Sequence, residues 1–221
     1  MEKLINIHTH GLIAQGAITI LNRMHNEEIP SEYSGYLSMG LHPMHSDQLT
    51  PELLVSIEEQ VISNKKIIAI GEIGLDKLCH VYLSSQITAF REQLKLADKH
   101  SLPCIIHNVR ATDEILREYN QSGNSHPLIF HGFRGKPVIA KQILSAGGYL
   151  SFGRAITTKD DATIASFLKT PTNKLFLETD EATDVTIEEV YKAAAMLKQI
   201  SEEELISEIS TNFARLFTER E

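Results

Sequence analysis

Six side chains of types that commonly bind metal ions stand at the ends of short apolar segments in this 221-residue chain. They are His8, His10, Glu72, His107, His131 and Asp180. Each segment is almost continuously apolar and closes at a polar residue, as is typical of a buried parallel strand. A strand buried on both faces has no structural need for a histidine or carboxylate at its end. We therefore expect these side chains to share one site, where the carboxyl ends of the strands meet.

His8 and His10 are the first pair of this set. Residues two apart in a strand point to the same face, so both imidazoles would be available to one ion. A lone His-x-His pair more often combines a buried structural histidine with a solvated one. The recurrence of histidines and carboxylates at the ends of the later strands favours the metal site.

The mixture of imidazole and carboxylate ligands suits Zn²⁺, Mn²⁺ or Fe²⁺, and its oxygens also suit Mg²⁺. Six ligands exceed the needs of one tetrahedral ion and fit two ions, with Glu72 as a bridging carboxylate. Two ions roughly 3.5–4 Å apart hold the attacking and leaving oxygens of a displacement, and a metal lowers the pKa of bound water to about 7. We assign Asp180 the role of general base and count Glu72 with it as catalytic.

The elements that must position these residues follow from the apolar periodicity and the turn signals. Strands are expected over residues 4–10, 17–21, 36–42, 67–73, 103–107, 127–131, 149–153 and 174–180. Helices are expected over 51–64, 84–100, 112–119, 137–145, 160–169 and most of the chain after residue 180. Strands alternating with helices predict an α/β protein of the TIM-like (β/α)8 barrel class. No repeat or linker divides it, so we expect one domain over residues 1–221.

Composition limits the classes of function. The net charge of −8 and the pI of about 5.7 give no overall basic footprint for nucleic acid. Bound cations and a few arginines can reverse the sign locally, so nucleic acid stays possible. No apolar stretch reaches the roughly 18 residues of a membrane span, and the start does not read as a signal peptide. With two separated cysteines that read as reduced, we expect a cytoplasmic protein with no membrane partner and no obligate protein partner.

Several segments together resemble the TatD-type metal-dependent hydrolases, often called TatD-related DNases, of the amidohydrolase superfamily. The matching segments are His8-Thr9-His10, Gly40-Leu41-His42-Pro43, Ala69 to Asp76, His107, His131-Gly132-Phe133, Leu177-Glu178-Thr179-Asp180 and Asn212 to Phe217. The resemblance implies a metal-dependent barrel with the six residues above as ligands. We expect two divalent ions, of Mg, Mn or Zn. The resemblance also implies phosphodiester hydrolysis of DNA, commonly exonucleolytic, so DNA or another phosphodiester is the expected substrate.

The chain departs from that family pattern around the expected substrate. Asn6 stands where the family usually has Asp, and the arginine-bearing loop that usually follows the Glu-Thr-Asp segment is missing. Arg134 and Arg110 follow His131 and His107 closely and are our candidates for substrate phosphate, because guanidinium forks match phosphate oxygens. For each, a solvated surface role is the alternative.

His42, at the end of its predicted strand, is a third substrate-binding candidate that would orient substrate or act as an acid. Its alternative is a supporting or helix-capping role.

Two other functions stay open. The acidic pI and the missing arginine loop favour an amidohydrolase-type esterase, lactonase or amidase that acts on a small acidic metabolite. A catalytically silent module that binds a metal or a partner is the alternative of another class, and the presence of all six ligand types argues against it.

Overall fold

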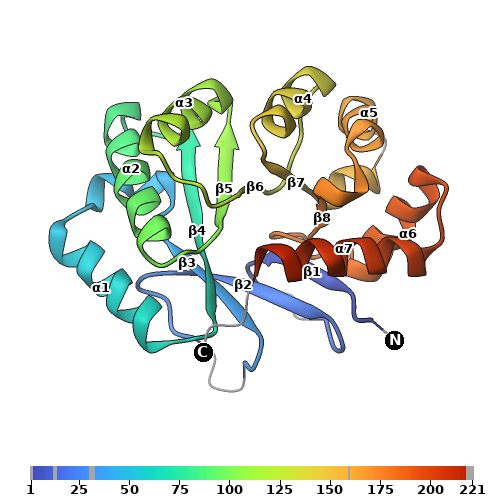
Figure 1. Ribbon diagram of the computed structural model, residues 1–221, viewed down its shortest axis with the longest axis horizontal. Helices are drawn as coiled ribbons and strands as arrows, with labels where there is room; N and C mark the ends of the chain where they lie inside the picture. Colours follow the sequence, from blue (N-terminus) through green and yellow to red (C-terminus); the bar gives the residue numbers. More distant parts are fainter. Residues whose placement is uncertain (1, 12–13, 30–32, 159, 218–221) are drawn as a thin grey trace. The chain divides into compact units, whose positions relative to one another are not determined.

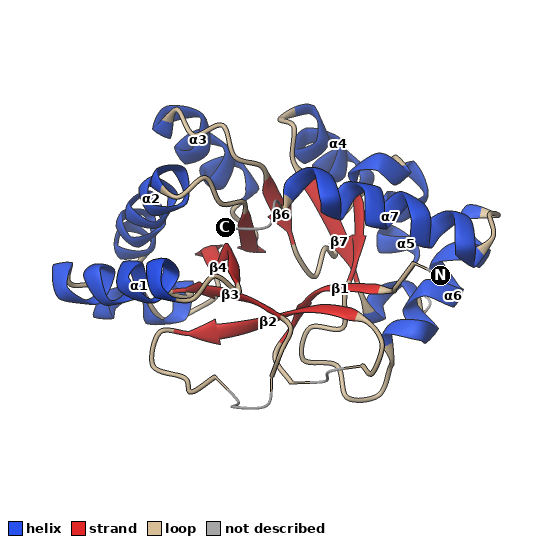
Figure 2. Cartoon of the chain, turned by 60° about the horizontal axis from the view of Figure 1, so that its bottom comes forward, coloured by secondary structure: helices blue, strands red, loops and turns tan. Residues whose placement is uncertain are grey.

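Eight strands form one sheet in which each strand neighbours the next along the chain (Figures 1 and 2). The computed structural model describes residues 2–11, 14–29, 33–158 and 160–217. The strands are β1 (Ile5–Thr9), β2 (Ile18–Met24), β3 (Tyr36–Gly40), β4 (Ile67–Asp76), β5 (Cys104–Val109), β6 (Leu128–Phe130), β7 (Tyr149–Phe152) and β8 (Leu175–Leu177). All eight predicted strands are present. The weakly predicted strand at 17–21 is the longer β2, and β8 ends three residues before the predicted Asp180.

The α-helices are α1 (Pro51–Ser63), α2 (Leu83–Lys99), α3 (Thr112–Ser122), α4 (Pro137–Ser145), α5 (Asp161–Lys169), α6 (Ile187–Lys198) and α7 (Glu202–Leu216). Short 3-10 helices are η1 (Pro43–Gln48), η2 (Arg154–Ile156) and η3 (Thr172–Lys174). Helix starts follow the capping rules: the Thr50 hydroxyl accepts from Leu53 N before α1, and Thr186 with Glu189 forms a full capping box before α6. The predicted helices are therefore confirmed, with ends shifted by a few residues.

The fold class follows from strand order and direction. The recorded pairings are parallel, and an isolated parallel bridge between Thr9 and Asp180 joins the end of β1 to the segment after β8. A sheet whose last strand returns to its first is a barrel, which confirms the predicted TIM-like (β/α)8 class. One detail differs: the described parts of the connections before β2 and β3 contain no helix, so the alternation with helices starts after β3.

Contacts between residues divide the chain into two compact units. Among the described residues, the first unit contains 2–11, 14–21, 129–158 and 160–217, and the second contains 22–29 and 33–128. Each unit has its own buried core. That residues 1–221 form one domain stays a prediction.

In the first unit, helices pack aromatic side chains against the sheet. Phe152 of β7 contacts Phe167 of α5 at a ring separation of 5.2 Å, and both are fully buried. The buried Tyr191 hydroxyl of α6 donates to Ile5 O and accepts from Ile5 N, at 3.1 and 3.0 Å. These bonds fix β1, the strand that carries the first histidine pair, against its helix.

In the second unit, two buried glutamines of α2 hold the ends of neighbouring strands. Gln93 accepts from Leu41 N at 2.6 Å and donates to Leu41 O at 3.0 Å, just beyond β3. Gln86 accepts from Asp76 N at 2.7 Å and donates to Asp76 O at 2.9 Å, at the end of β4. A side-chain amide that bonds both backbone groups of one residue replaces the partners that the ending strand lacks. The backbone beside His42 and Glu72 is thereby fixed.

Candidate metal centre

Four of the six predicted ligands come together in the first unit, and we call His8, His10, His131 and Asp180 the first cluster. Ligand atoms of His8, His131 and Asp180 lie within 4.8 Å of one another. Asp180 Oδ1 lies 3.6 Å from His8 Nε2 and 3.7 Å from His10 Nε2. His8 is fully buried, whereas the Asp180 side chain is 40% exposed. The cluster therefore has a buried floor and one carboxylate open to solvent.

Backbone bonds between the ends of β1 and β8 hold Asp180 in place. Asp180 N donates to His8 O at 3.0 Å, and His10 N donates to Asp180 O at 3.2 Å. Asp180 itself has a left-handed backbone, with φ of 52°. Aspartate is one of the few non-glycine residues that adopt this conformation readily, and such conformations concentrate at functional sites. The turn at Asp180 ends β8 before the strand reaches the predicted length.

Glu178 lies directly behind His131. Its side chain is fully buried; Oε1 accepts from Gly132 N at 2.6 Å and lies 3.5 Å from His131 Nδ1. A carboxylate beside one ring nitrogen orients a metal-binding histidine and raises its basicity. Glu178 therefore favours His131 Nε2 as the atom that would face an ion.

The other two predicted ligands lie in the second unit together with His42, and we call His42, Glu72 and His107 the second cluster. Their ligand atoms also lie within 4.8 Å of one another. Glu72 Oε1 lies 2.5 Å from His107 Nδ1 and 3.4 Å from His42 Nε2, and the Glu72 side chain is only 5% exposed. A buried carboxylate between two imidazoles is a suitable donor set for a divalent cation.

A further contact of His42 determines which of its ring nitrogens carries the hydrogen. Met44 N donates to His42 Nδ1 at 3.1 Å, which caps η1. A neutral imidazole that accepts at Nδ1 carries its hydrogen on Nε2, the nitrogen that faces Glu72. His42 Nε2 is thus a hydrogen-bond donor that faces His107 Nδ1 at 3.2 Å and Glu72 Oε1 at 3.4 Å. This donor fits the predicted orienting or acid role, and the bond from Met44 N is the predicted capping role.

Asp76 is a site residue that the sequence reasoning missed. Asp76 Oδ2 lies 3.4 Å from His107 Nε2, so carboxylates face both ring nitrogens of His107. Asp76 therefore supports His107 as Glu178 supports His131. The available signal was its position four residues after Glu72 in β4, because residues separated by an even number point to the same face of a strand.

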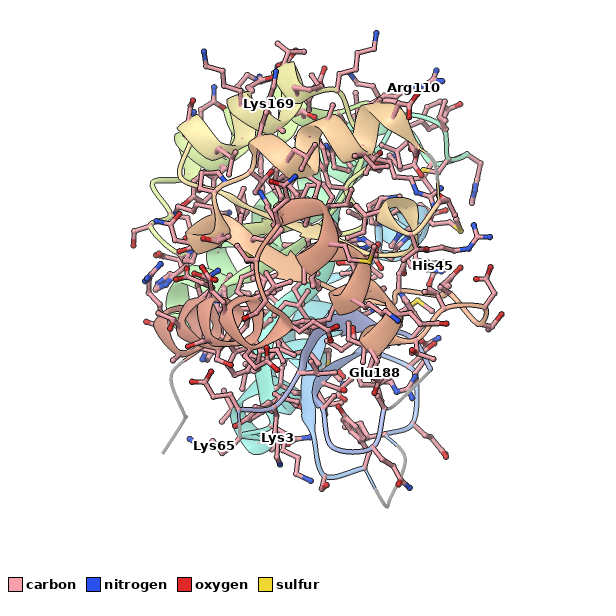
Figure 3. All side chains as sticks on the ribbon, turned by 90° about the vertical axis from the view of Figure 1, so that its right-hand side faces the viewer. Lys3, His45, Lys65, Arg110, Lys169 and Glu188 are labelled. Atoms are coloured by element: carbon pink, nitrogen blue, oxygen red, sulfur yellow. The ribbon has the colours of Figure 1, made fainter. Side chains whose placement is uncertain are left out.

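The two predicted substrate arginines are exposed. Arg134 follows the first cluster at β6, and Arg110 (labelled in Figure 3) follows β5 with a left-handed φ of 55°. Their role in binding substrate stays a prediction.

Arg154, directly after β7, was not predicted as a site residue. Its Nε and Nη2 bind the Asp184 carboxylate at 2.8 Å. This arginine holds the pKa of Asp184 below its usual value, mainly through the side-chain hydrogen bond. An arginine does stand at the edge of the first unit, but a carboxylate of the same unit binds its guanidinium.

Both clusters contain imidazole nitrogens and carboxylate oxygens that lie close enough together to bind one divalent cation. His8, His10, His131 and Asp180 would hold an ion in the first cluster, and Glu72 and His107 in the second. The prediction that all six ligands make one centre bridged by Glu72 joins the two units and stays a prediction.

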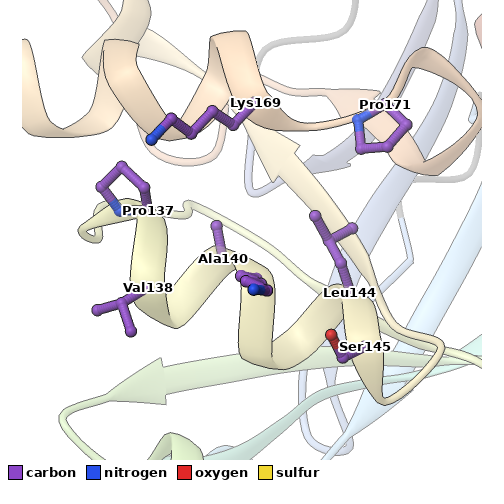
Figure 4. A pocket seen from close by; sticks show the side chains of 8 residues that line it. Pro137, Val138, Ala140, Leu144, Ser145, Lys169 and Pro171 are labelled. Atoms are coloured by element: carbon purple, nitrogen blue, oxygen red, sulfur yellow. The ribbon is translucent and has the colours of Figure 1, made fainter.

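A groove between α4 and α5 lies in the first unit (Figure 4). It has a volume of about 540 Å³ and is lined mainly by apolar residues, among them Pro137, Ala140 and Leu144, with Lys141 and Lys169. Its lining contains no histidine or carboxylate, so it offers no metal ligands. No helix in the described ranges is long and apolar enough to cross a membrane.

Comparisons with known proteins identify the family of the chain. The sequence model of the family "TatD related DNase" matches residues 5–218. The uncharacterized metal-dependent hydrolase YabD of Bacillus subtilis is 32% identical over 82% of this chain and 77% of its own length. The uncharacterized metal-dependent hydrolase YjjV of Escherichia coli is 33% identical over 66% of this chain and 57% of its own length.

A solved structure supports the fold. The crystal structure of YjjV, a TatD homologue from E. coli, superposes with a TM-score of 0.84 and covers 97% of each chain, at 22% identity over the superposition. A likeness at that identity shows the barrel fold. Together with the family match over nearly the whole sequence, it leaves one assignment: the chain belongs to the TatD related DNase family of metal-dependent hydrolases.

Proposed function

We propose that this metal-dependent hydrolase cleaves phosphodiester bonds of DNA, removing nucleotides from an end, with two divalent cations among Mg, Mn and Zn. The observation that carries the proposal is the Asp180 carboxylate, 40% exposed and within 3.7 Å of both His8 and His10. The Asp180 carboxylate is accessible to a large substrate and at the same time lies beside the two histidines that would bind the cation. The family description supports DNA as the substrate class.

We assign one cation to each cluster. When bound, the cations would supply Lewis-acid polarisation of phosphate and a more acidic water. The chain's own contributions are distinct from this. Glu178 and Asp76 hold the imidazoles of His131 and His107 in place. Asp180 accepts the proton of the attacking water, because it is the one first-cluster carboxylate open to solvent.

His42 holds a proton at Nε2, given its Nδ1 contact with Met44 N. In the proposed reaction this N–H donates a hydrogen bond to a developing negative oxygen of the substrate or leaving group. Such a donor stabilises charge that forms in the transition state. His42 therefore acts as a hydrogen-bond donor, and its role is separate from the proton acceptance that we assign to Asp180.

The activity test uses a 3′- or 5′-labelled single-stranded oligonucleotide with Mg²⁺ or Mn²⁺. Stepwise shortening that is abolished by EDTA and by Asp180→Asn supports the proposal. Asp161→Asn, an exposed aspartate in the first turn of α5, is the matched control and should stay active. An intact oligonucleotide with metal-loaded protein refutes the DNase proposal.

The number of cations has a separate test. Metal analysis of the purified, loaded protein should give two ions per chain. His131→Ala and His107→Ala should each leave one ion, because each removes a ligand from a different cluster. Loss of both ions with either variant would show that the clusters do not bind independently.

A second candidate is hydrolysis of an ester, lactone or amide of a small acidic metabolite. The Arg154–Asp184 pair favours it, since that arginine is bound by a carboxylate rather than free for a polyanion. Metal-dependent turnover of such compounds, without cleavage of DNA, would select this candidate.

A further inference from the structure

The loop after β4, residues 77–82, exposes two large side chains although its backbone is well fixed, and we call it the rim loop. Leu78 is 64% exposed and Tyr82 is 82% exposed. The Tyr82 side chain makes no capping hydrogen bond to α2. Both side chains are therefore available to a ligand.

Buried side chains hold the rim loop from the inside. Gln86, 1% exposed, donates to Val81 O at 2.8 Å and to Asp76 O at 2.9 Å. Val81 is 7% exposed and is the apolar anchor of the loop. The buried bonds of Gln86 therefore hold the backbone from which the exposed Tyr82 ring projects.

The rim loop is bonded to the second cluster through Asp76. Asp76 Oδ1 accepts from Leu78 N at 2.7 Å and from Cys79 N at 3.2 Å. The other oxygen of the same carboxylate lies 3.4 Å from His107 Nε2. The loop and the candidate ligand His107 are thus fixed by one side chain, which links the position of the loop to that of the site.

The positively charged Arg110 follows the strand residue that is bonded to the start of the rim loop. Lys77 N donates to Val109 O at 3.1 Å, and the exposed Arg110 follows Val109 directly. The Lys77 ammonium binds Glu114 at 2.7 Å, whereas no carboxylate in the described part of the chain pairs with the Arg110 guanidinium. The rim loop thus offers an aromatic ring and an apolar side chain, and β5, whose last residue is bonded to the first residue of the loop, leads directly to an unpaired guanidinium. These are the side-chain types of a platform for single-stranded nucleic acid.

We propose that the rim loop is a stacking subsite for unpaired nucleobases, with the Tyr82 ring as the platform, Leu78 beside it and Arg110 on a backbone phosphate. This subsite rests on the proposed phosphodiesterase function and names its substrate class. Bases inside a duplex are covered by their neighbours, so the subsite selects single strands. Each base has a flat aromatic face, so the subsite is tolerant of sequence.

The kinetic test compares two labelled oligomers of equal length, oligothymidylate and an oligomer of abasic tetrahydrofuran units. Both carry the same phosphodiester chain, and only the first carries bases. Tyr82→Ala should lower the ratio of kcat/KM values, thymidylate over abasic, by about 5- to 150-fold, the range of one lost base–aromatic stack. Tyr82→Phe should keep the ratio. Ile62→Ala, at a 53% exposed position on α1, is the control and should leave it unchanged. An unchanged ratio in Tyr82→Ala overturns the proposal.

A binding test separates the subsite from catalysis. The chain contains no tryptophan, so Tyr82→Trp introduces a single fluorophore at the platform. In an Asp180→Asn background, thymidylate should quench its emission and the abasic oligomer should not. Ile62→Trp is the matched control and should respond to neither oligomer. Equal or absent quenching by both oligomers overturns the subsite. Quenching by thymidylate alone, together with cleavage of neither oligomer by the metal-loaded protein with Asp180 intact, keeps the subsite and refutes the nuclease function.

Discussion

The hydroxyl of Thr179 is the middle of a buried hydrogen-bond chain that ends on the backbone of Asp180. Asn6 Nδ2 donates to Thr179 Oγ1 at 2.8 Å, Thr179 Oγ1 donates to Thr9 Oγ1 at 3.1 Å, and Thr9 Oγ1 donates to Asp180 O at 3.1 Å. Thr179 N also donates to Asn6 Oδ1, which fixes the orientation of the amide. The direction of the chain is therefore determined by Asn6.

Thr179→Val removes this hydroxyl with almost no change of shape. The Asn6 amide, in a fully buried side chain, loses the acceptor for one N–H, at a cost of about 1–3 kcal/mol. Thr9 loses one donor and keeps its bond to Asp180 O, which adds about 0.5–1 kcal/mol. We expect a total loss of about 1.5–4 kcal/mol. For a chain of this length, that corresponds to a fall in Tm of about 3–16 °C.

The assay is urea unfolding in EDTA, so that cation binding does not contribute to the measured stability. Thr179→Ser is the matched control, because it keeps the hydroxyl and loses one buried methyl group, at about 1 kcal/mol. If the valine variant unfolds at the same urea concentration as the unmodified protein, the chain through Thr179 contributes nothing and the reasoning is refuted.

Two further predictions concern stability and thiol reactivity. Tyr191→Phe should lower the free energy of unfolding by about 2–6 kcal/mol, since both backbone groups of buried Ile5 lose their bond to the hydroxyl. The same change at the 82% exposed Tyr82 should stay within about 0.5 kcal/mol in urea unfolding, and equal losses would contradict the argument. One thiol should react with a disulfide reagent in the native protein: Cys79 is partly exposed, whereas burial raises the pKa of Cys104 to about 12. Cys104 should react only in denaturant, and two equally fast native thiols would contradict its burial.

The sequence predicted best what depends on one element at a time. Apolar runs such as Ile67–Ile70 identify buried strands without knowledge of their partners, and the His8–His10 spacing needs only the strand period. The weak segment at 17–21 is a strand because it pairs with β1, which puts Ile18 beside Ile5. Whether a weakly patterned segment forms a strand depends on the strand that it pairs with, and a single sequence does not reveal that partner.

The missed residues depend on contacts between elements. Asp76 faces His107 because β4 and β5 pair with Asp76 beside Val109 and Gly74 beside His107. The Arg154–Asp184 pair likewise depends on two loops that follow different strands. The residue types of Asp76, Arg154 and Asp184 indicate that each side chain could bind an ion or a substrate. Strand register and loop conformation determine what each one contacts.

The supporting carboxylates explain why both clusters favour a cation. Glu178 is fully buried, and one of its oxygens, Oε2, has no hydrogen-bond partner in the described part of the chain. A buried carboxylate beside a neutral imidazole is costly, because little compensates its charge. When His131 binds a cation through its other nitrogen, the ring becomes a stronger donor toward Glu178, and the buried charge gains a partner. Asp76 stands in the same relation to His107, so beside each cluster a carboxylate gains a stronger hydrogen-bond donor when an ion binds the adjacent histidine.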